Sequence, residues 1–520
     1  MMTDKMKKLM SLCIGRYHVL NQKVHEILRE DEPRCMRNNG NLKAFLKQGK
    51  IVQTVFFAVT CLFITYIFGN FAVRPLFDEE LNKEKKSTIR LNMSASVEGS
   101  IVDRNGDLIY GGAPAGEIPA VDEGHNWMFL GYRNPDEIGN QIGAGILAGC
   151  AEYQLYYLDS SDKGATVVLT VDTELQQTLT SLLETEPFAS SSEGSSVIVM
   201  DNATGEIIAY ASHSSADFDV NNPSETLNSH IDGAGYIRGV YENDPPGSTF
   251  KIITALAAYR YASENNESMD IFDYNDDGSE IMGASVRNAG DENYGWLDIH
   301  EAFSWSVNTF FANAACITGA ERLKEMAESF LIGTTVEIPY FASFTSAFTY
   351  DPEHDDASPG TQVLCDTAYG QGYTQVTPMN LLLICNALAN DGNMLQPHMV
   401  KRIYSAKKTL YEAETEIIAQ PVTSDEAQYI KGLMNEAAEF YGLNEYGVFC
   451  AKTGTAECEQ DAEGNTTRSH TYLAGFCDEY SFVISVNDGS SSYALYNPNS
   501  CSPAEQVIEA VNAYYERSES

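Results

Sequence analysis

Two residues with the chemistry of a covalent catalyst, Ser248 and Lys251, lie three positions apart in the chain. The Pro-Pro-Gly at 245–247 ends any preceding element, and the apolar spacing of residues 249–262 predicts a helix that begins beside the serine. Residues three apart share a helix face, so the amine should lie within hydrogen-bond reach of the hydroxyl. The helix dipole and burial both disfavour an ammonium ion here, so Lys251 can be neutral near pH 7 and can take the proton of Ser248.

Two further motifs favour a catalytic role for Ser248 and Lys251 over the alternative, in which these residues merely begin an ordinary surface helix. A Ser and a Lys three apart arise by chance in most long chains. Here Ser306 and Asn308 form a Ser-x-Asn motif that begins 58 residues after Ser248. The segment Lys452-Thr453-Gly454-Thr455 begins 144 residues after Asn308. Together, and in this order, the three motifs favour catalysis.

Each of these residues also has an ordinary structural interpretation. Ser306 and Asn308 could cap a turn, and Thr455 could serve only in strand pairing. Tyr369 or Gln371 could line the site, although a role in the core or in a turn suits them better.

The motifs need a scaffold, and periodicity and turn signals predict one. Ile299–Cys316 predicts one helix that presents the Ser-x-Asn motif, and Gly447–Lys452 predicts a strand that carries Lys-Thr-Gly at its end. Thr471–Phe476 and Tyr480–Val486 predict two further strands, which would form an antiparallel run behind the site. The acidic stretch 274–283 lacks the ligand spacing of a calcium loop and predicts a solvated turn.

The other predicted elements complete a fold class. They are a hairpin at 94–110, strands at 166–171, 195–200 and 206–212, helices at 172–183 and 503–515, and an apolar core helix that follows turn residues within 371–392. Ser502 and Glu505 form a capping box at the start of the last helix. Helices first, strands later and a terminal helix predict an α+β fold, in which a central antiparallel sheet is flanked by helices.

The charge is divided between two parts of the chain, which points to two compartments. The 520 residues carry a net charge of -40, which argues against nucleic-acid binding, yet residues 1–50 hold 11 Lys+Arg against 5 Asp+Glu. Residues 51–73 are uncharged and long enough to cross a bilayer, for which about 20 apolar residues suffice. A buried core helix or a cleaved signal peptide is the alternative, but no cleavage site is clear. Lysines on the N-terminal flank place residues 1–50 in the cytoplasm and the acidic body outside.

We therefore expect a membrane-anchored protein of four parts. These are a basic cytoplasmic segment (1–50), a transmembrane helix (51–73), a short N-terminal pedestal module (74–164) and a catalytic domain (165–520). The 11 cysteines and nine histidines show no metal-ligand spacing, so neither a metal nor another cofactor is expected. Cys458 and Cys477 could face each other on neighbouring strands, although buried free thiols are the simpler expectation.

The motifs resemble those of class B penicillin-binding proteins, which are monofunctional D,D-transpeptidases with a β-lactamase-like fold. The resemblance covers roughly residues 51–520. Beyond the three motifs it rests on Ala368–Gly372 with Thr374–Pro378, Ala456 and Glu457, Ser469–Tyr472 with Gly475 and Phe476, and Gly99–Gly106. Glu98 stands where the family usually has Arg, which puts a local salt bridge of the N-terminal module in doubt.

The resemblance implies acyl transfer through a serine intermediate and assigns a role to each residue. Ser248 would attack a D-Ala-D-Ala stem peptide with Lys251 as base, and Ser306 would relay a proton toward the leaving D-alanine. Asn308 would hold the peptide amide, and Lys452 would supply positive charge. Substrate binding would fall to the Thr453-Gly454-Thr455 segment, whose hydroxyls would hold the carboxylate. The backbone N–H groups at 248 and 455 would form the oxyanion hole.

The resemblance also implies a cellular setting. A single-pass protein would hold its catalytic domain on the extracellular or periplasmic side of the cell membrane and would act in cell-wall elongation or division, and hence in cell shape. Its partners would be peptidoglycan stem peptides, β-lactam antibiotics and a polytopic glycan polymerase of the shape, elongation, division and sporulation family.

Three rival functions share parts of the same pattern. A β-lactamase or D,D-carboxypeptidase would use water as acceptor, but no glutamate suited to deacylation is evident. A β-lactam sensor would carry several spans and a protease segment, and this chain has neither. The complete motif set argues against a catalytically weak scaffold that only activates a glycan polymerase, but it leaves open a scaffolding role in addition to catalysis.

Overall fold

The computed structural model describes residues 95–518 except for short gaps. The gaps are 96, 115–119, 122–127, 136–140, 156–162, 187, 190, 192–193, 214–236, 348–356, 373, 449, 461–465, 488–492 and 497–501. All described residues belong to one compact unit, Met93–Ser520. The predicted segments 1–50 and 51–73 lie outside them, and none of the helices within the described ranges is long and apolar enough to cross a membrane.

A five-stranded antiparallel sheet forms the centre of this unit, as predicted. In spatial order its strands are β17 (Cys450–Gln460), β18 (Thr466–Phe476), β19 (Tyr480–Asn487), β7 (Gly194–Asp201) and β8 (Ile207–His213). The strands β7 and β19 are buried along nearly their whole length, which explains the apolar runs at their centres.

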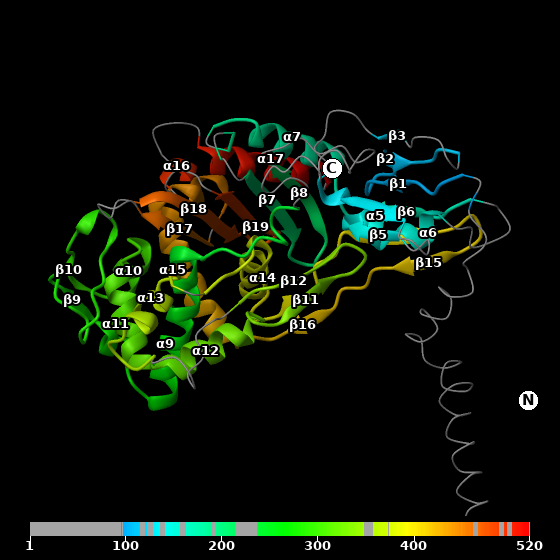
Figure 1. The fold of residues 1–520 in the computed structure, drawn as a ribbon. Coiled ribbons are helices and arrows are strands. Elements are labelled where there is room, and N and C mark those ends of the chain that lie inside the picture. Colours follow the sequence, from blue (N-terminus) through cyan, green and yellow to red (C-terminus); the bar gives the residue numbers. More distant parts are fainter. Residues whose placement is uncertain are drawn as a thin grey trace, which may run out of the picture. The chain divides into compact units, whose positions relative to one another are not determined.

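Helices cover both faces of the central sheet (Figure 1). On one side lie α7 (Thr173–Leu183) and α17 (Pro503–Ser518), and on the other lie α9 (Lys251–Asn265), α14 (Pro378–Ala389) and α15 (Ser424–Phe440). The predicted caps are present. Asp172 accepts a hydrogen bond from the Leu175 amide at 2.9 Å, and the amide of Glu505 donates to the Ser502 hydroxyl at 3.2 Å. The central antiparallel sheet with helices on both faces confirms the predicted α+β class.

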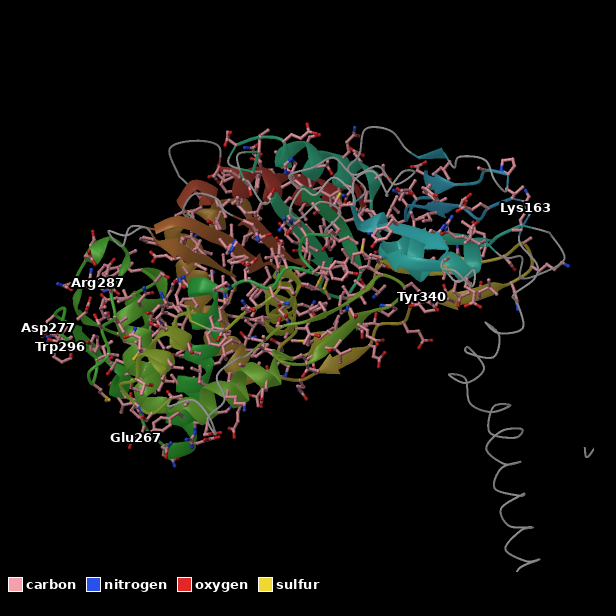
Figure 2. All side chains as sticks on the ribbon, in the orientation of Figure 1. Lys163, Glu267, Asp277, Arg287, Trp296 and Tyr340 are labelled. Carbon is pink, nitrogen blue, oxygen red and sulfur yellow. The ribbon has the colours of Figure 1, made fainter. Side chains whose placement is uncertain are left out.

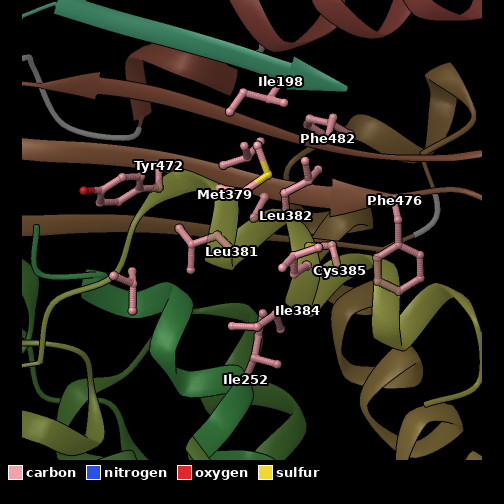
Figure 3. Close-up of a cluster of buried hydrophobic side chains, with 14 of the residues drawn as sticks. Ile198, Ile252, Met379, Leu381, Leu382, Ile384, Cys385, Tyr472, Phe476 and Phe482 are labelled. Carbon is pink, nitrogen blue, oxygen red and sulfur yellow. The ribbon is translucent and has the colours of Figure 1, made fainter. Parts of the chain in front are cut away.

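The helix α14 packs at the centre of the apolar core between the sheet and α9. Figure 3 shows Met379, Leu382 and Cys385 of α14 among sheet residues that include Phe476 and Phe482. Eleven of its 12 residues are buried, so this helix is apolar on all sides rather than amphipathic. The core helix predicted within 371–392 is confirmed as Pro378–Ala389, and it fixes the sheet against the helical layer that carries the motifs.

A second sheet joins the N-terminal part of the described chain to later strands. In spatial order it contains β15 (Thr409–Glu412), β14 (Val400–Tyr404), β6 (Thr166–Leu169), β1 (Ile101–Val102), β2 (Leu108–Gly111) and β3 (Ala120–Val121). The predicted hairpin at 94–110 is present as β1 and β2, and β1 pairs in parallel with β6. This sheet therefore joins strands from both sides of the boundary expected at residue 164.

The N-terminal module holds an ion pair at the position where the sequence put one in doubt. Arg133 donates to the carboxylate of Glu98 and, at 3.1 Å, to Gln154 Oε1. Both side chains of the ion pair are largely buried. A pair is thus present with Glu98 as its acidic member.

Shorter elements complete the unit. The strands are β4 (Tyr132–Pro135), β5 (Gln141–Ala144), β9 (Tyr274–Asp276), β10 (Gly295–Leu297), β11 (Thr335–Ile338), β12 (Ala342–Thr345), β13 (Met394–Leu395) and β16 (Ile417–Ala419). The α-helices are α5 (Gly145–Gly149), α6 (Ala151–Leu155), α10 (Ile299–Ser304), α11 (Asn308–Thr318), α12 (Ala320–Ser329), α13 (Gln362–Ala368) and α16 (Tyr493–Tyr496). The 3-10 helices are η2 (Met128–Leu130), η3 (Gly247–Phe250), η4 (Met269–Phe272), η5 (Ala289–Asp291) and η6 (Leu443–Tyr446).

Two local expectations were wrong, and the less favoured alternative for the cysteines, a pair facing each other, does not occur. The single helix expected at 299–316 is two helices, α10 and α11, because the chain turns sharply at Ser306. The Lys-Thr-Gly motif lies inside β17, since pairing with β18 continues to Gln460. The register of that pairing sets Cys450 opposite Phe476 and Glu457 opposite Ser469, so position 458 and Cys477 lie at opposite ends of the two strands. Cys477 is a buried free thiol.

Candidate active site

The Ser-x-x-Lys pair lies where a 3-10 turn passes into a helix. Ser248 is in η3, and Lys251 is the first residue of α9 and is fully buried. The Nζ of Lys251 lies 2.9 Å from the Oγ of Ser248, so the predicted contact between amine and hydroxyl is present.

Lys251 contacts oxygen atoms of three residues. Besides Ser248, its Nζ donates to the Ser306 carbonyl at 2.5 Å and to Asn308 Oδ1 at 2.8 Å, and it lies 3.1 Å from Ser306 Oγ. Burial, followed by the positive charge of Lys452, holds the pKa of Lys251 well below its usual range. Both effects favour the neutral form of the amine, as the sequence led us to expect.

A strained turn brings Ser306 to both lysines. Its φ of 61° is in the left-handed region, which costs a non-glycine residue free energy and often marks functional sites. The turn directs both the carbonyl and the hydroxyl of Ser306 at Lys251. Because a continuous helix would turn one of these groups away, the break between α10 and α11 is what assembles this part of the site.

Asn308 is held by the segment between β9 and β10. Its Nδ2 donates to the Arg287 carbonyl at 2.9 Å, which leaves Oδ1 facing Lys251. Its backbone amide donates at 2.9 Å to Oδ1 of Asn288. The Nδ2 of Asn288 in turn donates to the Asp276 carboxylate at 2.8 Å. Asn288 therefore caps α11 from outside the helix. By holding the backbone of Asn308, it helps to fix the side-chain amide of that residue, which faces the lysine.

Sequence analysis missed Asn288 and misread Asp276. The acidic stretch was expected to be a solvated turn, yet Asp276 is 1% exposed and ends β9. Its carboxylate accepts from Asn288 and from the Tyr294 amide. Figure 2 shows the neighbouring Asp277 and Trp296 at one end of the molecule, over β9 and β10. No motif marks Asn288, because the helix that it caps, α11, begins 20 residues further along the chain.

Lys452 joins the cluster of Ser248, Lys251 and Ser306 from the side of the central sheet. Its Nζ donates to Ser306 Oγ at 3.0 Å, to Tyr441 Oη at 3.2 Å and to the Thr453 carbonyl at 3.3 Å. The side chain is fully buried, and this burial lowers its pKa to about 7. The Ser306 hydroxyl thus lies between two lysines whose proton affinities are both reduced.

The remaining residues of Lys-Thr-Gly-Thr line β17 beside η3. Thr453 Oγ1 donates to Tyr441 Oη at 3.1 Å. A Cβ on Gly454 would lie 2.7 Å from the Pro246 carbonyl, so glycine is what lets β17 approach the serine turn. Thr455 is partly exposed at this edge of the site. Tyr441 was missed by sequence analysis, since it belongs to no motif.

A second glycine contact supports the serine turn from behind. Gly370 has a φ of 80°, and a Cβ built on it would lie 1.9 Å from the Gly247 carbonyl. The Gly247 amide donates to the Gly370 carbonyl at 2.8 Å. The hydroxyl of the neighbouring Tyr369 donates a hydrogen bond to Asp366. This contact agrees with the structural role expected for Tyr369, in preference to a role in lining the site.

A buried polar network anchors the segment that leads into Ser248. Asn487 donates to Glu242 at 2.7 Å and to Asp244 at 2.8 Å, and the His470 imidazole lies 3.2 Å from Asp244. Arg238 forms an ion pair with Glu242. The network ties this segment to β18 and β19. Among the described residues no cluster of His, Cys, Asp or Glu side chains could hold a metal ion.

Comparison with known proteins agrees with this geometry. Residues 195–504 match the family described as the penicillin-binding protein transpeptidase domain. The peptidoglycan D,D-transpeptidase PbpA of Mycolicibacterium smegmatis is 25% identical over 314 residues, which is 56% of this chain and 62% of that protein. The stage V sporulation protein D of Bacillus subtilis is 28% identical over 333 residues, which is 62% of this chain and 49% of that protein. The matches thus span about half to three fifths of the length of these relatives.

A solved structure shares the fold. Penicillin-binding protein A of Mycobacterium tuberculosis, determined as an imipenem acyl-enzyme complex, matches 82% of this chain and 99% of that chain with a TM-score of 0.67. The sequence identity is 20%. The likeness establishes the fold of the sheet and the helices that carry the motifs.

Proposed function

The chain belongs to the penicillin-binding protein transpeptidase family, and we propose that it is a serine-type D,D-transpeptidase that cross-links peptidoglycan stem peptides through an acyl-enzyme on Ser248. The reaction class is supported by relatives that are named peptidoglycan D,D-transpeptidases. Binding of β-lactams is supported by a structural neighbour that was solved as an imipenem acyl-enzyme.

The observation that carries the proposal is the set of partners around Lys251. A neutral amine has two N–H donors and one lone pair. The Ser306 carbonyl and Asn308 Oδ1 can only accept, so they take both donors. The lone pair is left for the hydroxyl of Ser248, which lies 2.9 Å away and then donates its proton. Lys251 is therefore the base that activates the serine.

The proposed reaction proceeds in two displacements. Lys251 removes the proton while Ser248 Oγ bonds to the carbonyl carbon of the penultimate D-alanine. The C–N bond to the terminal D-alanine breaks, and the proton passes by way of Ser306 to the leaving amine. The Ser306 hydroxyl lies 3.1 Å from the Nζ of Lys251 and 3.0 Å from that of Lys452, so it can relay a proton between them. An amine of a neighbouring strand then attacks the ester carbon and forms the new amide bond, while a proton from that amine passes by way of Lys251 to Ser248 Oγ as the ester C–O bond breaks.

Substrate binding is assigned to the edge of β17 and to Asn308. The hydroxyls of Thr453 and Thr455 would bind the terminal carboxylate, with the charge of Lys452 behind them. Asn308 would hold the peptide amide. The backbone N–H groups of Ser248 and Thr455 would form the oxyanion hole. The close approach of β17 to the serine turn at Gly454 supports this assignment, because it brings the two segments together.

The setting of the reaction follows from the expected segments of the chain. Residues 51–73 would form the single span, with residues 1–50 in the cytoplasm and the pedestal and catalytic domains (74–164 and 165–520) outside. A polytopic glycan polymerase would supply the strands to be cross-linked, in elongation, division or sporulation. A weak scaffold, a D,D-carboxypeptidase and a β-lactamase remain the alternative functions for this site.

Labelling of the full chain in membranes with a fluorescent penicillin tests the proposal. Stable labelling that Ser248→Ala abolishes is expected. Ser263→Ala, on an exposed serine of α9, is the matched control and should label normally. Rapid turnover of the drug by the wild type would identify a β-lactamase. A folded wild type that does not label would identify a scaffold.

A further inference from the structure

Tyr441 places a phenol hydroxyl beneath the Lys-Thr-Gly motif. It ends α15 and is 4% exposed. Its Oη lies 3.2 Å from Lys452 Nζ and 3.1 Å from Thr453 Oγ1. Its ring packs against Tyr496 with centroids 4.8 Å apart and lies beside the Lys452 amine. One hydroxyl thus contacts both the cation and the hydroxyl that are assigned to the substrate carboxylate.

The protons available to these groups restrict how they can be arranged. Charged Lys452 has three donors and no acceptor, and its three donors are taken by Ser306, Tyr441 and the Thr453 carbonyl. Toward the lysine, Tyr441 can therefore only accept. Its own proton is then free to point at Thr453 Oγ1.

The bond between the two hydroxyls can run in either direction. In the unliganded arrangement Thr453 donates to Tyr441. A carboxylate can only accept, so when it arrives Thr453 must turn its proton toward it. Tyr441 then donates to the vacated Thr453 oxygen. Each group keeps a partner in both states, and reversal of the bond needs no movement of the backbone.

We propose that Tyr441 is a positioning residue for recognition of the substrate carboxylate. Its hydroxyl would donate to Thr453, so that the Thr453 hydroxyl points its own proton at the carboxylate, and would accept a hydrogen bond from charged Lys452. This inference rests on the proposed function and extends it to the terminal carboxylate of the acyl donor. In the described part of the chain, the titratable groups that face Lys452 include Lys251 from α9 and Tyr441 from the C-cap of α15. Burial raises the pKa of Tyr441, so the phenol keeps its proton at physiological pH.

Tyr441→Phe tests the role, because it removes one oxygen and keeps the ring. Tyr429→Phe is the matched control, since it removes a hydroxyl from the same helix that is buried without a hydrogen-bond partner among the described residues. The substrates are two thioester acyl donors that differ only in the terminal group, which is a carboxylate in one and a carboxamide in the other. The full chain in detergent is used, and the second-order rate constant of acylation is measured by mass spectrometry of the acyl-enzyme.

We expect Tyr441→Phe to lower the constant about tenfold for the carboxylate donor and less than about twofold for the carboxamide donor. Tyr429→Phe should change neither. Loss of the acceptor for charged Lys452 should also lower the pKa of that lysine. The decline of carboxylate-donor acylation with rising pH, which follows loss of the Lys452 charge, should therefore begin at lower pH in the variant.

The results separate this inference from the proposed function. An equal loss with both donors, or no loss with either, would overturn the role of Tyr441 while the wild type still acylates. A wild type that acylates with neither donor would overturn the proposed function and this inference with it. Where Tyr441→Phe folds, its double variant with Thr453→Val gives a second test: the two changes must be less than additive for the carboxylate donor, and additive effects contradict the coupling. If Tyr441→Phe does not fold, Thr453→Val alone decides, because it removes the hydroxyl that Tyr441 is proposed to orient; a loss that is equal for the two donors then overturns the inference.

Discussion

The two buried lysines should make the stability of this protein depend on pH in an unusual direction. Lys452 is fully buried, and its pKa is about 7 against 10.5 for an exposed lysine. Between these values the unfolded chain binds a proton that the folded chain does not. By linkage, the free energy of unfolding therefore rises with pH across this window. The penalty is complete below about pH 7 and vanishes above about pH 10.5.

The size of the effect follows from the shift. Each pKa unit corresponds to about 1.4 kcal/mol, so the shift of Lys452 costs the fold about 5 kcal/mol at pH 6 and about 2 kcal/mol at pH 9. Lys452→Met keeps a side chain of similar volume and removes the titration. Relative to the wild type, the variant should lose about 3 kcal/mol of stability between pH 6 and pH 9. The lost hydrogen bonds to Ser306 and Tyr441 add an offset that does not change with pH.

Denaturant unfolding of the full chain at pH 6, 7.5 and 9, followed by tryptophan fluorescence, measures this difference. Lys251, whose pKa lies well below its usual range, adds a slope of the same sign to the wild type and to the variant, so its contribution largely cancels in their difference. Lys324→Met, on a partly exposed lysine of α12, is the matched control and should run parallel to the wild type. Parallel curves for Lys452→Met and the wild type would refute a buried lysine of low pKa.

Two further substitutions test the supports of the site. Asn288→Ala should cost about 1–2 kcal/mol of stability through the lost cap of α11 and should slow penicillin acylation, because Asn308 loses its anchor; unchanged acylation kinetics would show that Asn288 supports only the fold. Gly370→Ala should destabilise the protein by more than about 2 kcal/mol in thermal unfolding, because its Cβ would collide with the Gly247 carbonyl at a φ of 80°. Its control is Gly432→Ala in α15, where a Cβ meets open space and the gain in helix propensity should stabilise the protein; equal effects of the two substitutions would contradict the argument.

Local patterns predicted the strands of the central sheet and several helices around it, because their signals lie within a few residues. The helix Thr173–Leu183 has its cap at Asp172, and the helix Pro378–Ala389 has Thr377 and a proline at its start. Alternation and turn residues likewise predicted the strands of the central sheet. Errors arose where a distant contact overrode the local pattern. At Ser306 an apolar segment that could form one helix is broken by a strained turn that Lys251 stabilises.

The sequence by itself determined which chemical groups this protein brings to its site. A serine, two lysines, a Ser-x-Asn and a Lys-Thr-Gly-Thr occur in one order, and that order is visible without coordinates. Only the tertiary structure decided which protons these groups can exchange. The two acceptors that occupy Lys251, the cap from Asn288 and the phenol of Tyr441 all join segments that are distant in sequence. Burial sets the pKa of Lys452, and burial depends on how the sheet and the helices pack. Periodicity reports which face of an element is buried, but it does not report which residue of another element meets that face.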